Sequence, residues 1–116
     1  MKKILIANRG EIAIRIARTC NDLSIKAIGI YSEDDLNSLH LSKMDESFMV
    51  DEKGASAYLN IKKIIDIAKQ EKVDGIHPGY GFLSENPAFA KAAKQAKIKF
   101  IGPSEKSLKI FGNKSE

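Results

Sequence analysis

The sequence has few of the features that extracellular and membrane proteins depend on. Its 116 residues include one cysteine, Cys20, which excludes an internal disulfide and a zinc site made of several cysteines. No apolar run approaches the roughly 20 residues of a membrane span. The apolar stretch at residues 4–7 is too short for the core of a secretory signal. We therefore expect a cytoplasmic protein with no membrane partner.

An excess of charge of one sign is also missing. The 19 Lys and Arg residues against 15 Asp and Glu residues give a formal net charge of +4, and the lysines are spread along the chain. No basic run alternates with aromatic residues, so the lysines indicate solvated helix faces rather than a nucleic-acid partner. Cys20 lies within an apolar pattern and has no neighbouring histidine, which favours a small core residue over a reactive thiol.

The residues that are present predict one small α/β domain. Apolar residues make up 43% and charged residues 29% of the chain, which is typical of a globular protein. Short, continuous apolar runs predict strands at residues 4–7, 27–31, 48–50, 75–77 and 99–101. Because the runs do not alternate with polar residues, they indicate a parallel sheet that is covered on both faces.

Helical patterns fill the intervals between these runs. After Gly10, a predicted core-facing stripe consists of Ile12, Ala13, Ile16, Ala17, Cys20 and Leu23. Asn60 is a predicted N-cap, and the helix after it repeats apolar residues at Ile61, Ile64, Ile65 and Ala68.

Asn86 and Pro87 predict another helix start, because proline at the first helical position loses no hydrogen bond. The predicted buried face of that helix is Ala88, Phe89, Ala92, Ala93 and Ala96. A last helix is expected from Pro103, and residues 32–46 read as a loop with a short helix at 36–41. The alternation of strands and helices predicts a doubly wound fold: about five parallel strands with helices on both faces.

The turn after the first predicted strand has one glycine where a dinucleotide-binding enzyme needs several. Gly10 stands alone, without the G-x-G-x-x-G spacing, so a hydride-transfer enzyme is disfavoured even though Glu33 follows the second strand. Asn8 and Glu11 have the spacing of a capping box, with Asn8 as the N-cap. Two interpretations are open for this turn: a capped helix start, or a segment that faces a ligand.

Charged residues gather on the side of the first helix opposite its predicted core stripe. Arg15, Arg18 and Asp22 lie there with Ile14 beside them, and Arg18 and Asp22 have the i, i+4 spacing of an ion pair. A solvated face and a subunit contact are both open, because arginine next to an apolar residue is common at interfaces.

Residues 77–86 form the densest candidate site. They follow the fourth predicted strand, and ligands of open α/β sheets bind at the carboxyl ends of strands. Gly79 and Gly81 permit close approach of a ligand to the backbone, and they flank Tyr80. His77 and Glu85 add titratable groups on either side. The other interpretation is a tight turn with a buried aromatic ring before a capped helix.

Several segments resemble the N-terminal domain of biotin carboxylases, including those of acetyl-CoA, propionyl-CoA, methylcrotonyl-CoA and pyruvate carboxylases. The segments that carry the resemblance are residues 7–15, 56–60, 77–86 and 100–103, and they occur in order through the whole chain. The resemblance implies a Rossmann-like preATP-grasp domain over residues 1–116. It also implies that this domain packs against an ATP-grasp domain that holds most ligands of ATP, magnesium and bicarbonate.

The resemblance further implies roles for single residues. His77, Tyr80, Gly81 and Glu85 would lie at the biotin and bicarbonate cleft, with Tyr80 and Gly81 as part of the biotin wall. Lys114 matches a lysine that contacts ATP. Arg15, Arg18 and Asp22 would lie at the interface of a homodimer.

The expected function is therefore that of one part of an ATP-dependent ligase, which carboxylates biotin on a carrier protein and works with a carboxyltransferase. The ATP-grasp and C-terminal domains, with the metal ligands and the catalytic base, are expected outside this chain, so the chain alone is expected to be inactive. The alternative is a non-catalytic preATP-grasp module for binding or dimerisation. The residues do not distinguish which carboxylase is involved.

Overall fold

A parallel five-stranded sheet organises the chain in a computed structural model, which describes residues 1–35 and 38–101. The strand order is β3-β2-β1-β4-β5, and its members are β1 (Lys3–Ile6), β2 (Lys26–Tyr31), β3 (Glu46–Met49), β4 (Gly75–His77) and β5 (Lys99–Phe100). The α-helices are α1 (Gly10–Asp22), α2 (Ile61–Gln70) and α3 (Pro87–Gln95), and two 3₁₀ helices are η1 (Leu39–Lys43) and η2 (Gly54–Tyr58). The predicted fold class and all the predicted strands are confirmed.

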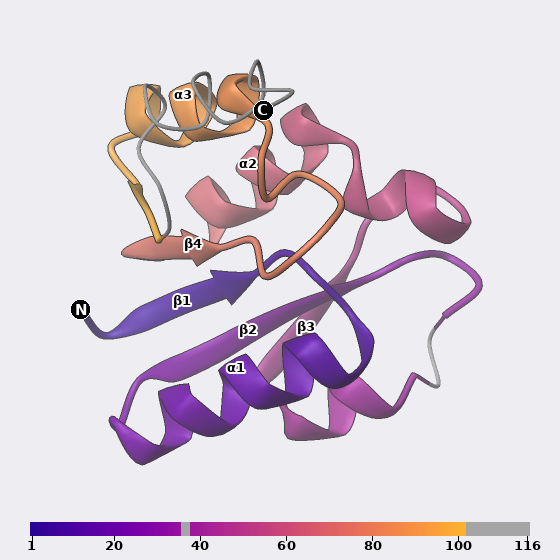
Figure 1. Cartoon of the computed structure of the whole chain (residues 1–116), viewed down its shortest axis with the longest axis vertical. Coiled ribbons are helices and arrows are strands. Elements are labelled where there is room, and N and C mark those ends of the chain that lie inside the picture. The colour runs from indigo at the N-terminus through magenta and orange to yellow at the C-terminus, as the bar shows by residue number, and fades with distance from the viewer. Residues whose placement is uncertain (36–37, 102–116) are drawn as a thin grey trace, which may run out of the picture.

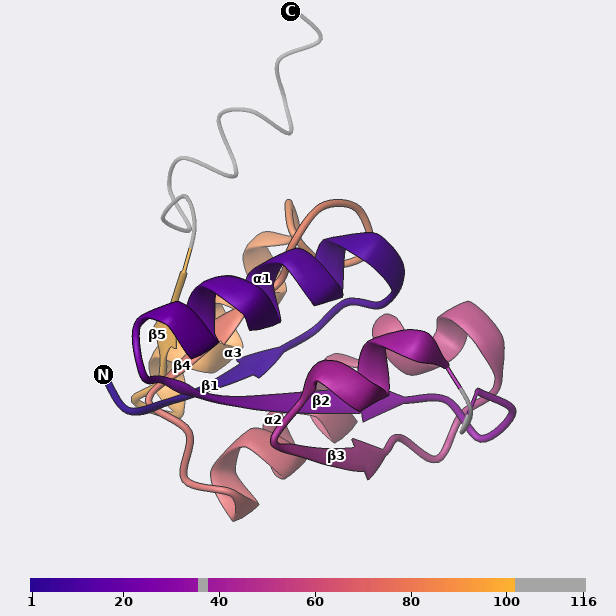
Figure 2. The same cartoon turned by 90° about the horizontal axis from the view of Figure 1, so that it is seen from below.

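Helices cover both faces of the sheet, as expected for a parallel sheet (Figure 1). Side chains of β1 alternate between the faces: Leu5 belongs to the core beneath α2 and α3, whereas Ile4 and Ile6 pack with α1. Figure 2 shows α1 lying along the face opposite α2. The region described contains no helix that is long and apolar enough to cross a membrane.

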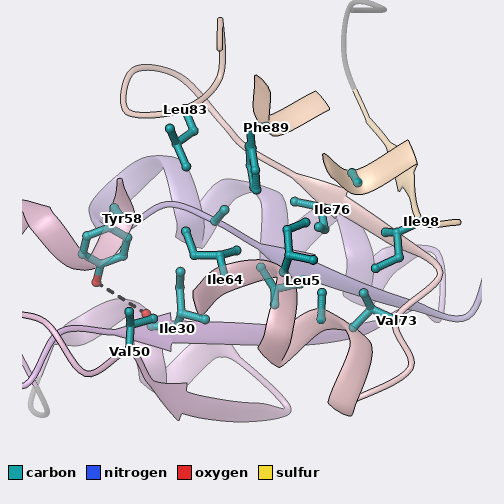
Figure 3. Packing of buried hydrophobic residues seen from close by; sticks show 14 of the residues in the cluster. Leu5, Ile30, Val50, Tyr58, Ile64, Val73, Ile76, Leu83, Phe89 and Ile98 are labelled. Atoms are coloured by element: carbon teal, nitrogen blue, oxygen red, sulfur yellow. Dashed lines mark hydrogen bonds between the residues drawn. The ribbon is translucent and has the colours of Figure 1, made fainter. Parts of the chain in front are cut away.

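The larger core lies between the sheet and the helices α2 and α3 (Figure 3). Phe89 of α3 is fully buried and meets the ring of Phe100 edge-on, with the centroids 5.6 Å apart. Tyr58 is also fully buried, and its hydroxyl donates to the carbonyl of Ile30 at 3.4 Å. Packing on both faces holds β1 and β4 at the centre of the sheet, so the loops that follow them start from fixed positions.

The predicted caps of α2 and α3 are confirmed. Asn60 accepts a hydrogen bond from the backbone N–H of Lys63, and Asn86 accepts from those of Ala88 and Phe89. Pro87 occupies the first helical position of α3, as predicted. These caps were predictable because each side chain bonds to backbone groups within three residues of itself.

The predicted buried faces of α1 and α3 need correction at their edges. Ile14 was expected on the outer side of α1 but is only 8% exposed, because α1 also packs against η1. Leu23 was expected in the core but is 64% exposed, since α1 ends at Asp22. In α3, Ala88 is exposed and Ala90 is buried in its place.

Other expectations on helices have mixed outcomes. Cys20 is buried, as predicted, and burial and the nearby Asp45 carboxylate both raise the pKa of its thiol. The short helix expected at residues 36–41 is found as η1 at Leu39–Lys43. The last helix, expected from Pro103, lies outside the described residues.

Candidate functional site

The candidate site lies where the strand order reverses. In the sheet, β2 lies on one side of β1 and β4 lies on the other. The chain therefore leaves the carboxyl end of β1 toward β2 and leaves the carboxyl end of β4 toward β5, in opposite directions. Figure 1 shows the chain after β4 arching beside the turn that joins β1 to α1. Ligands of open α/β sheets bind at such a switch point.

Asn8 connects these two loops. Its side chain is 2% exposed, and its Nδ2 donates to the carbonyls of Pro78 at 2.8 Å and Tyr80 at 2.7 Å. Its Oδ1 accepts from the backbone N–H of Arg9 at 2.8 Å. Asn8 therefore fastens the loop after β4 to the end of β1.

The predicted capping box at Asn8 and Glu11 is wrong. Helix α1 begins at Gly10 with Arg9 as its N-cap, and no side chain caps it. Asn8 lies one residue too early, and its amide group is engaged by the loop after β4. A tertiary contact has replaced the local one that the spacing predicted.

The two glycines of the loop have different surroundings. Both have left-handed backbones, with φ of +67° at Gly79 and +72° at Gly81. A Cβ atom at Gly79 would lie 2.6 Å from Asn8 Nδ2 and 2.8 Å from Ile12 Cγ2, whereas one at Gly81 would meet no atom within 4 Å. Gly79 is thus packed against the protein, and Gly81 faces open space.

The aromatic residues of the loop also divide between outside and inside. Tyr80 is 77% exposed, so it is not the buried aromatic of a simple turn. Phe82 turns inward and its ring lies 5.2 Å from that of Tyr58. Phe82 has φ of +47°, an unusual value for a bulky side chain and a source of local strain. The loop holds Phe82 in the protein while it presents Tyr80 to solvent.

His77 shapes the loop from its start. Its Nδ1 accepts a hydrogen bond from the backbone N–H of Gly79 at 3.1 Å, which places the proton of the neutral ring on Nε2. Burial lowers the pKa of His77 from 6.5, because a half-buried imidazolium loses hydration. The ring is therefore neutral at pH 7.

Glu85 is exposed near the end of the loop, one residue before the N-cap of α3. His77 ends β4, and Tyr80, Gly81 and Glu85 lie in the loop that follows it, where all three are exposed. Their closeness in space follows from their closeness in the sequence.

Arg9 lies beside this loop. Its guanidinium carbon is 5.7 Å from the ring centre of Tyr58 and 5.9 Å from that of Phe82, within the range of a cation–π contact. Its Nη1 lies 3.4 Å from Asp35 Oδ2. Burial, with the Asp35 carboxylate nearby, raises the pKa of Tyr58 to about 12, so Tyr58 stays neutral here.

The exposed side of α1 is a separate region. Arg15, Arg18 and Asp22 are all exposed, as predicted. The ion pair on this face joins Arg15 Nε to Glu11 Oε2 at 3.7 Å, and in the described part of the chain none joins Arg18 to Asp22. Both members of the observed pair are largely exposed, so the pair adds little stability.

The predicted ATP contact, Lys114, lies outside the described residues. Over residues 1–35 and 38–101, no group of three or more His, Cys, Asp or Glu side chains fits a metal ion.

The sequence left open a ligand-facing role for the turn that holds Asn8 and Arg9, but it gave no sign of the partners that these two side chains have. The partners of Asn8 are 70 and 72 residues away, and Asp35 is 26 residues from Arg9. Local spacing holds no signal for such pairs. The contact between the two loops depends on the parallel pairing of β1 with β4, which brings the carboxyl ends of these strands together.

Comparisons with known proteins agree with this architecture. The family model "Biotin carboxylase, N-terminal domain" matches residues 1–108. The pyruvate carboxylase of Staphylococcus aureus is 56% identical over 116 residues, which are 98% of this chain and 10% of that protein. The biotin carboxylase of Halalkalibacterium halodurans is 53% identical over 114 residues, which are 97% of this chain and 25% of that protein.

Solved structures show the same fold. The biotin carboxylase domain of a single-chain bacterial carboxylase has a TM-score of 0.95 and 43% identity, covering 99% of this chain and 27% of that one. The biotin carboxylase domain dimer of Hydrogenobacter thermophilus 2-oxoglutarate carboxylase, in complex with MgADP, ADP and bicarbonate, has a TM-score of 0.94 and 42% identity, covering 97% of this chain and 25% of that one. The match extends through both the sheet and the loop at its carboxyl edge, and this chain belongs to the biotin carboxylase N-terminal domain family.

Proposed function

We propose that this chain acts as the N-terminal domain of an ATP-dependent biotin carboxylase, in which the loop after β4 forms one wall of the cleft for biotin and bicarbonate. The complete enzyme uses ATP and magnesium to activate bicarbonate and carboxylates biotin on a carrier protein for a carboxyltransferase. ADP, magnesium and bicarbonate occur together in the related Hydrogenobacter thermophilus domain, which supports these cofactors.

The observation that carries the proposal is the asymmetry of the loop. Gly79 and Phe82 anchor it inward, whereas Gly81 leaves its outer side open and Tyr80 is largely exposed beside it. A flat ligand ring with polar edges suits such a surface, because the aromatic face packs against it and bare backbone approaches it closely. The neutral His77 adds no charge to this wall.

The chain provides a wall rather than a complete active site. Phosphoryl transfer requires metal ligands and cationic groups around the phosphates, and for this chain the family resemblance implies one ATP contact, Lys114. We therefore expect no bicarbonate-dependent ATP hydrolysis from the 116 residues alone. Turnover by the isolated chain, above that of a mock-purified control, would contradict this division of labour.

A hybrid enzyme tests the proposal. In it, this chain replaces the matching segment of the Halalkalibacterium halodurans biotin carboxylase, to which it is 53% identical. The hybrid should show biotin-dependent formation of ADP in the presence of bicarbonate. A folded hybrid without this activity would count against the proposed function and favour a non-catalytic module.

Two variants of the hybrid locate the ligands. Gly81→Val adds bulk where the loop is open, so it should raise the KM for free biotin and change that for ATP little. Lys114→Gln should show the reverse pattern, with about a tenfold or larger rise in the KM for ATP, because it loses a charge-assisted contact to phosphate.

Gly54→Val is the matched control for Gly81→Val. Gly54 also has a left-handed backbone with open space at its Cβ position, but it lies in η2. If Gly81→Val lowered only the melting temperature, as Gly54→Val should, the loop would be a structural turn.

We also propose that the exposed side of α1 contributes to a homodimer of the complete enzyme. Arg15 and Arg18 are exposed there, and the related Hydrogenobacter thermophilus domain is described as a dimer. In the hybrid, Arg18→Glu should lower the dimer fraction in sedimentation, whereas Lys91→Glu on the exposed side of α3 should not. Equal dimer fractions would show that the α1 side is merely solvated.

A further inference from the structure

The proposed binding loop is held in place by a residue outside it. The two hydrogen bonds of Asn8 Nδ2 end on the carbonyls of Pro78 and Tyr80, the residues that flank Gly79. Tyr80 itself is 77% exposed, so its ring contributes little to fixing its own position. The backbone at Tyr80 is therefore held by the side-chain amide group of Asn8, which is almost fully buried.

An asparagine side chain is suited to this task. It has two N–H groups, both used here on carbonyl oxygens, and one oxygen, used here on the N–H of Arg9. Aspartate has the same shape but donates no hydrogen bond when ionised, and serine is too short to span the same distance. The site thus selects for a neutral donor of this length.

Gly79 is complementary to Asn8. A side chain at residue 79 would meet both Asn8 Nδ2 and Cγ, at 2.6 and 3.0 Å. The absence of a side chain lets the loop backbone lie directly against the amide group. The contact between Asn8 and Gly79 therefore determines where the backbone of Tyr80 and Gly81 lies relative to the sheet.

We propose that Asn8 is a positioning residue for the biotin-facing loop, and that it acts through the backbone carbonyls of Pro78 and Tyr80 without touching biotin. This inference rests on the proposed function for the role of the loop, but not for the hydrogen bonds that hold it. It predicts that biotin kinetics depend on Asn8 more than ATP kinetics do.

The kinetic test uses Asn8→Ser in the hybrid enzyme, which removes both donors and buries no charge. Two hydrogen bonds of ordinary strength correspond to about a tenfold effect, so the KM for biotin should rise at least about tenfold. The KM for ATP should stay within about twofold, since the altered loop is not the proposed ATP contact. The proposal is wrong if both constants rise equally or if neither changes.

Asn60→Ser is the matched control. It makes the same chemical change outside the loop, at the N-cap of α2, where the side chain accepts from the backbone N–H of Lys63. Serine caps helices about as well as asparagine, so biotin and ATP kinetics should both stay as in the unaltered hybrid. A rise in the KM for biotin in this control as large as in Asn8→Ser would remove the special role of Asn8.

Hydrogen exchange of the 116-residue chain provides a test that needs no activity. In Asn8→Ser, the hydrogen-bonded amides of Gly79 and Ser84 should exchange at least about tenfold faster than in Asn60→Ser, because opening of the loop costs less. Amides of β1 and β2 should be unchanged. If the loop amides exchange at the same rate in both variants, Asn8 does not hold the loop.

The two tests separate the possible failures. An inactive hybrid with an unaltered chain would count against the proposed function, whereas the exchange measurement would still decide whether Asn8 holds the loop. Asn8→Asp, which keeps the shape and the acceptor but loses the donors, should reproduce the faster exchange. If the loop amides of Asn8→Asp exchanged no faster than those of the unaltered chain, the proposal would be overturned even if Asn8→Ser proved unstable.

Discussion

The amino ends and the carboxyl ends of the parallel strands, here called the amino edge and the carboxyl edge of the sheet, are stabilised by opposite kinds of hydrogen bond. At the amino edge, exposed carboxylates accept hydrogen bonds from the first backbone N–H groups of strands: Asp74 Oδ2 accepts from Lys2 and Lys3 at 2.7 and 2.8 Å. Asp45 Oδ2 likewise accepts from Ala27 at 2.7 Å. At the carboxyl edge, the buried amide group of Asn8 donates to loop carbonyls.

The difference follows from the direction of a parallel sheet. Strand starts leave N–H groups without partners, which a carboxylate satisfies, whereas strand ends leave carbonyls, which need a donor. The carboxylates of Asp45 and Asp74 are exposed and stay hydrated. A neutral amide at the carboxyl edge can be buried without a charge penalty, so this edge keeps a fixed shape on which a binding loop can be supported.

The largest effect should come from packing at the carboxyl edge. Gly79→Ala should lower the free energy of unfolding of the chain by about 3 kcal/mol, because it combines a strained backbone with a clash against Asn8. Gly81→Ala has the same backbone strain and no clash, so about 1–2 kcal/mol is expected. Urea unfolding at pH 7 measures both. Equal losses would show that Asn8 yields to the new side chain.

A smaller effect of opposite sign is expected near the amino edge, where the helices end. Lys97 follows the end of α3 with φ of +63°, a conformation that glycine adopts without strain. Lys97→Gly should raise the free energy of unfolding by up to about 1 kcal/mol. Lys91→Gly, inside α3, should lower it by about 1 kcal/mol. Destabilisation by both variants would show that the Lys97 side chain matters more than its backbone.

The carboxyl edge should also respond to mild acid through His77. Burial lowers the pKa of His77, so its stabilising contribution is complete above the ordinary value of 6.5 and is lost as the pH falls through the lowered value. Protonation also removes the acceptor for the N–H of Gly79. NMR titration of the imidazole, with urea unfolding at pH 7 and pH 5, measures this.

His77→Asn is the control for that titration. Asparagine can accept from the N–H two residues on, and it does not titrate. This variant should keep the loop and lose the dependence on pH below 6.5. An unchanged pH dependence would assign it to another group.

The smallest effect is expected from Asp74 at the amino edge, where the carboxylate is fully exposed. Hydrogen bonds from the N–H groups of Lys2 and Lys3 lower its pKa, so its contribution is present above 3.8 and is lost as the pH falls through the lowered value. Asp74→Ala should be less stable than the unaltered chain at pH 7, and the difference should vanish in strong acid. A difference that persists there would not come from the charge.

Local patterns were enough for most of the fold. The apolar runs determined all the strands, and Asn60 and Asn86 were predictable caps, because strand burial and capping depend on residues that are close in sequence. The resemblance of residues 77–86 to a known loop also located the candidate site before the structure did. The edges of the helical faces were less predictable: burial of Ile14 depends on η1, which the pattern of α1 does not contain.

Asn8 marks the limit of what the sequence by itself determined. Its spacing to Glu11 predicted a cap, by the same rule that succeeded at Asn60 and Asn86, yet its amide group bonds to residues about 70 positions away. An asparagine offers donors and an acceptor equally well to near and far partners. The sequence by itself determined which segments form strands and where the glycines of the loop lie. The tertiary structure decided the partners of Asn8, because only the parallel pairing of β1 and β4 brings those carbonyls within reach.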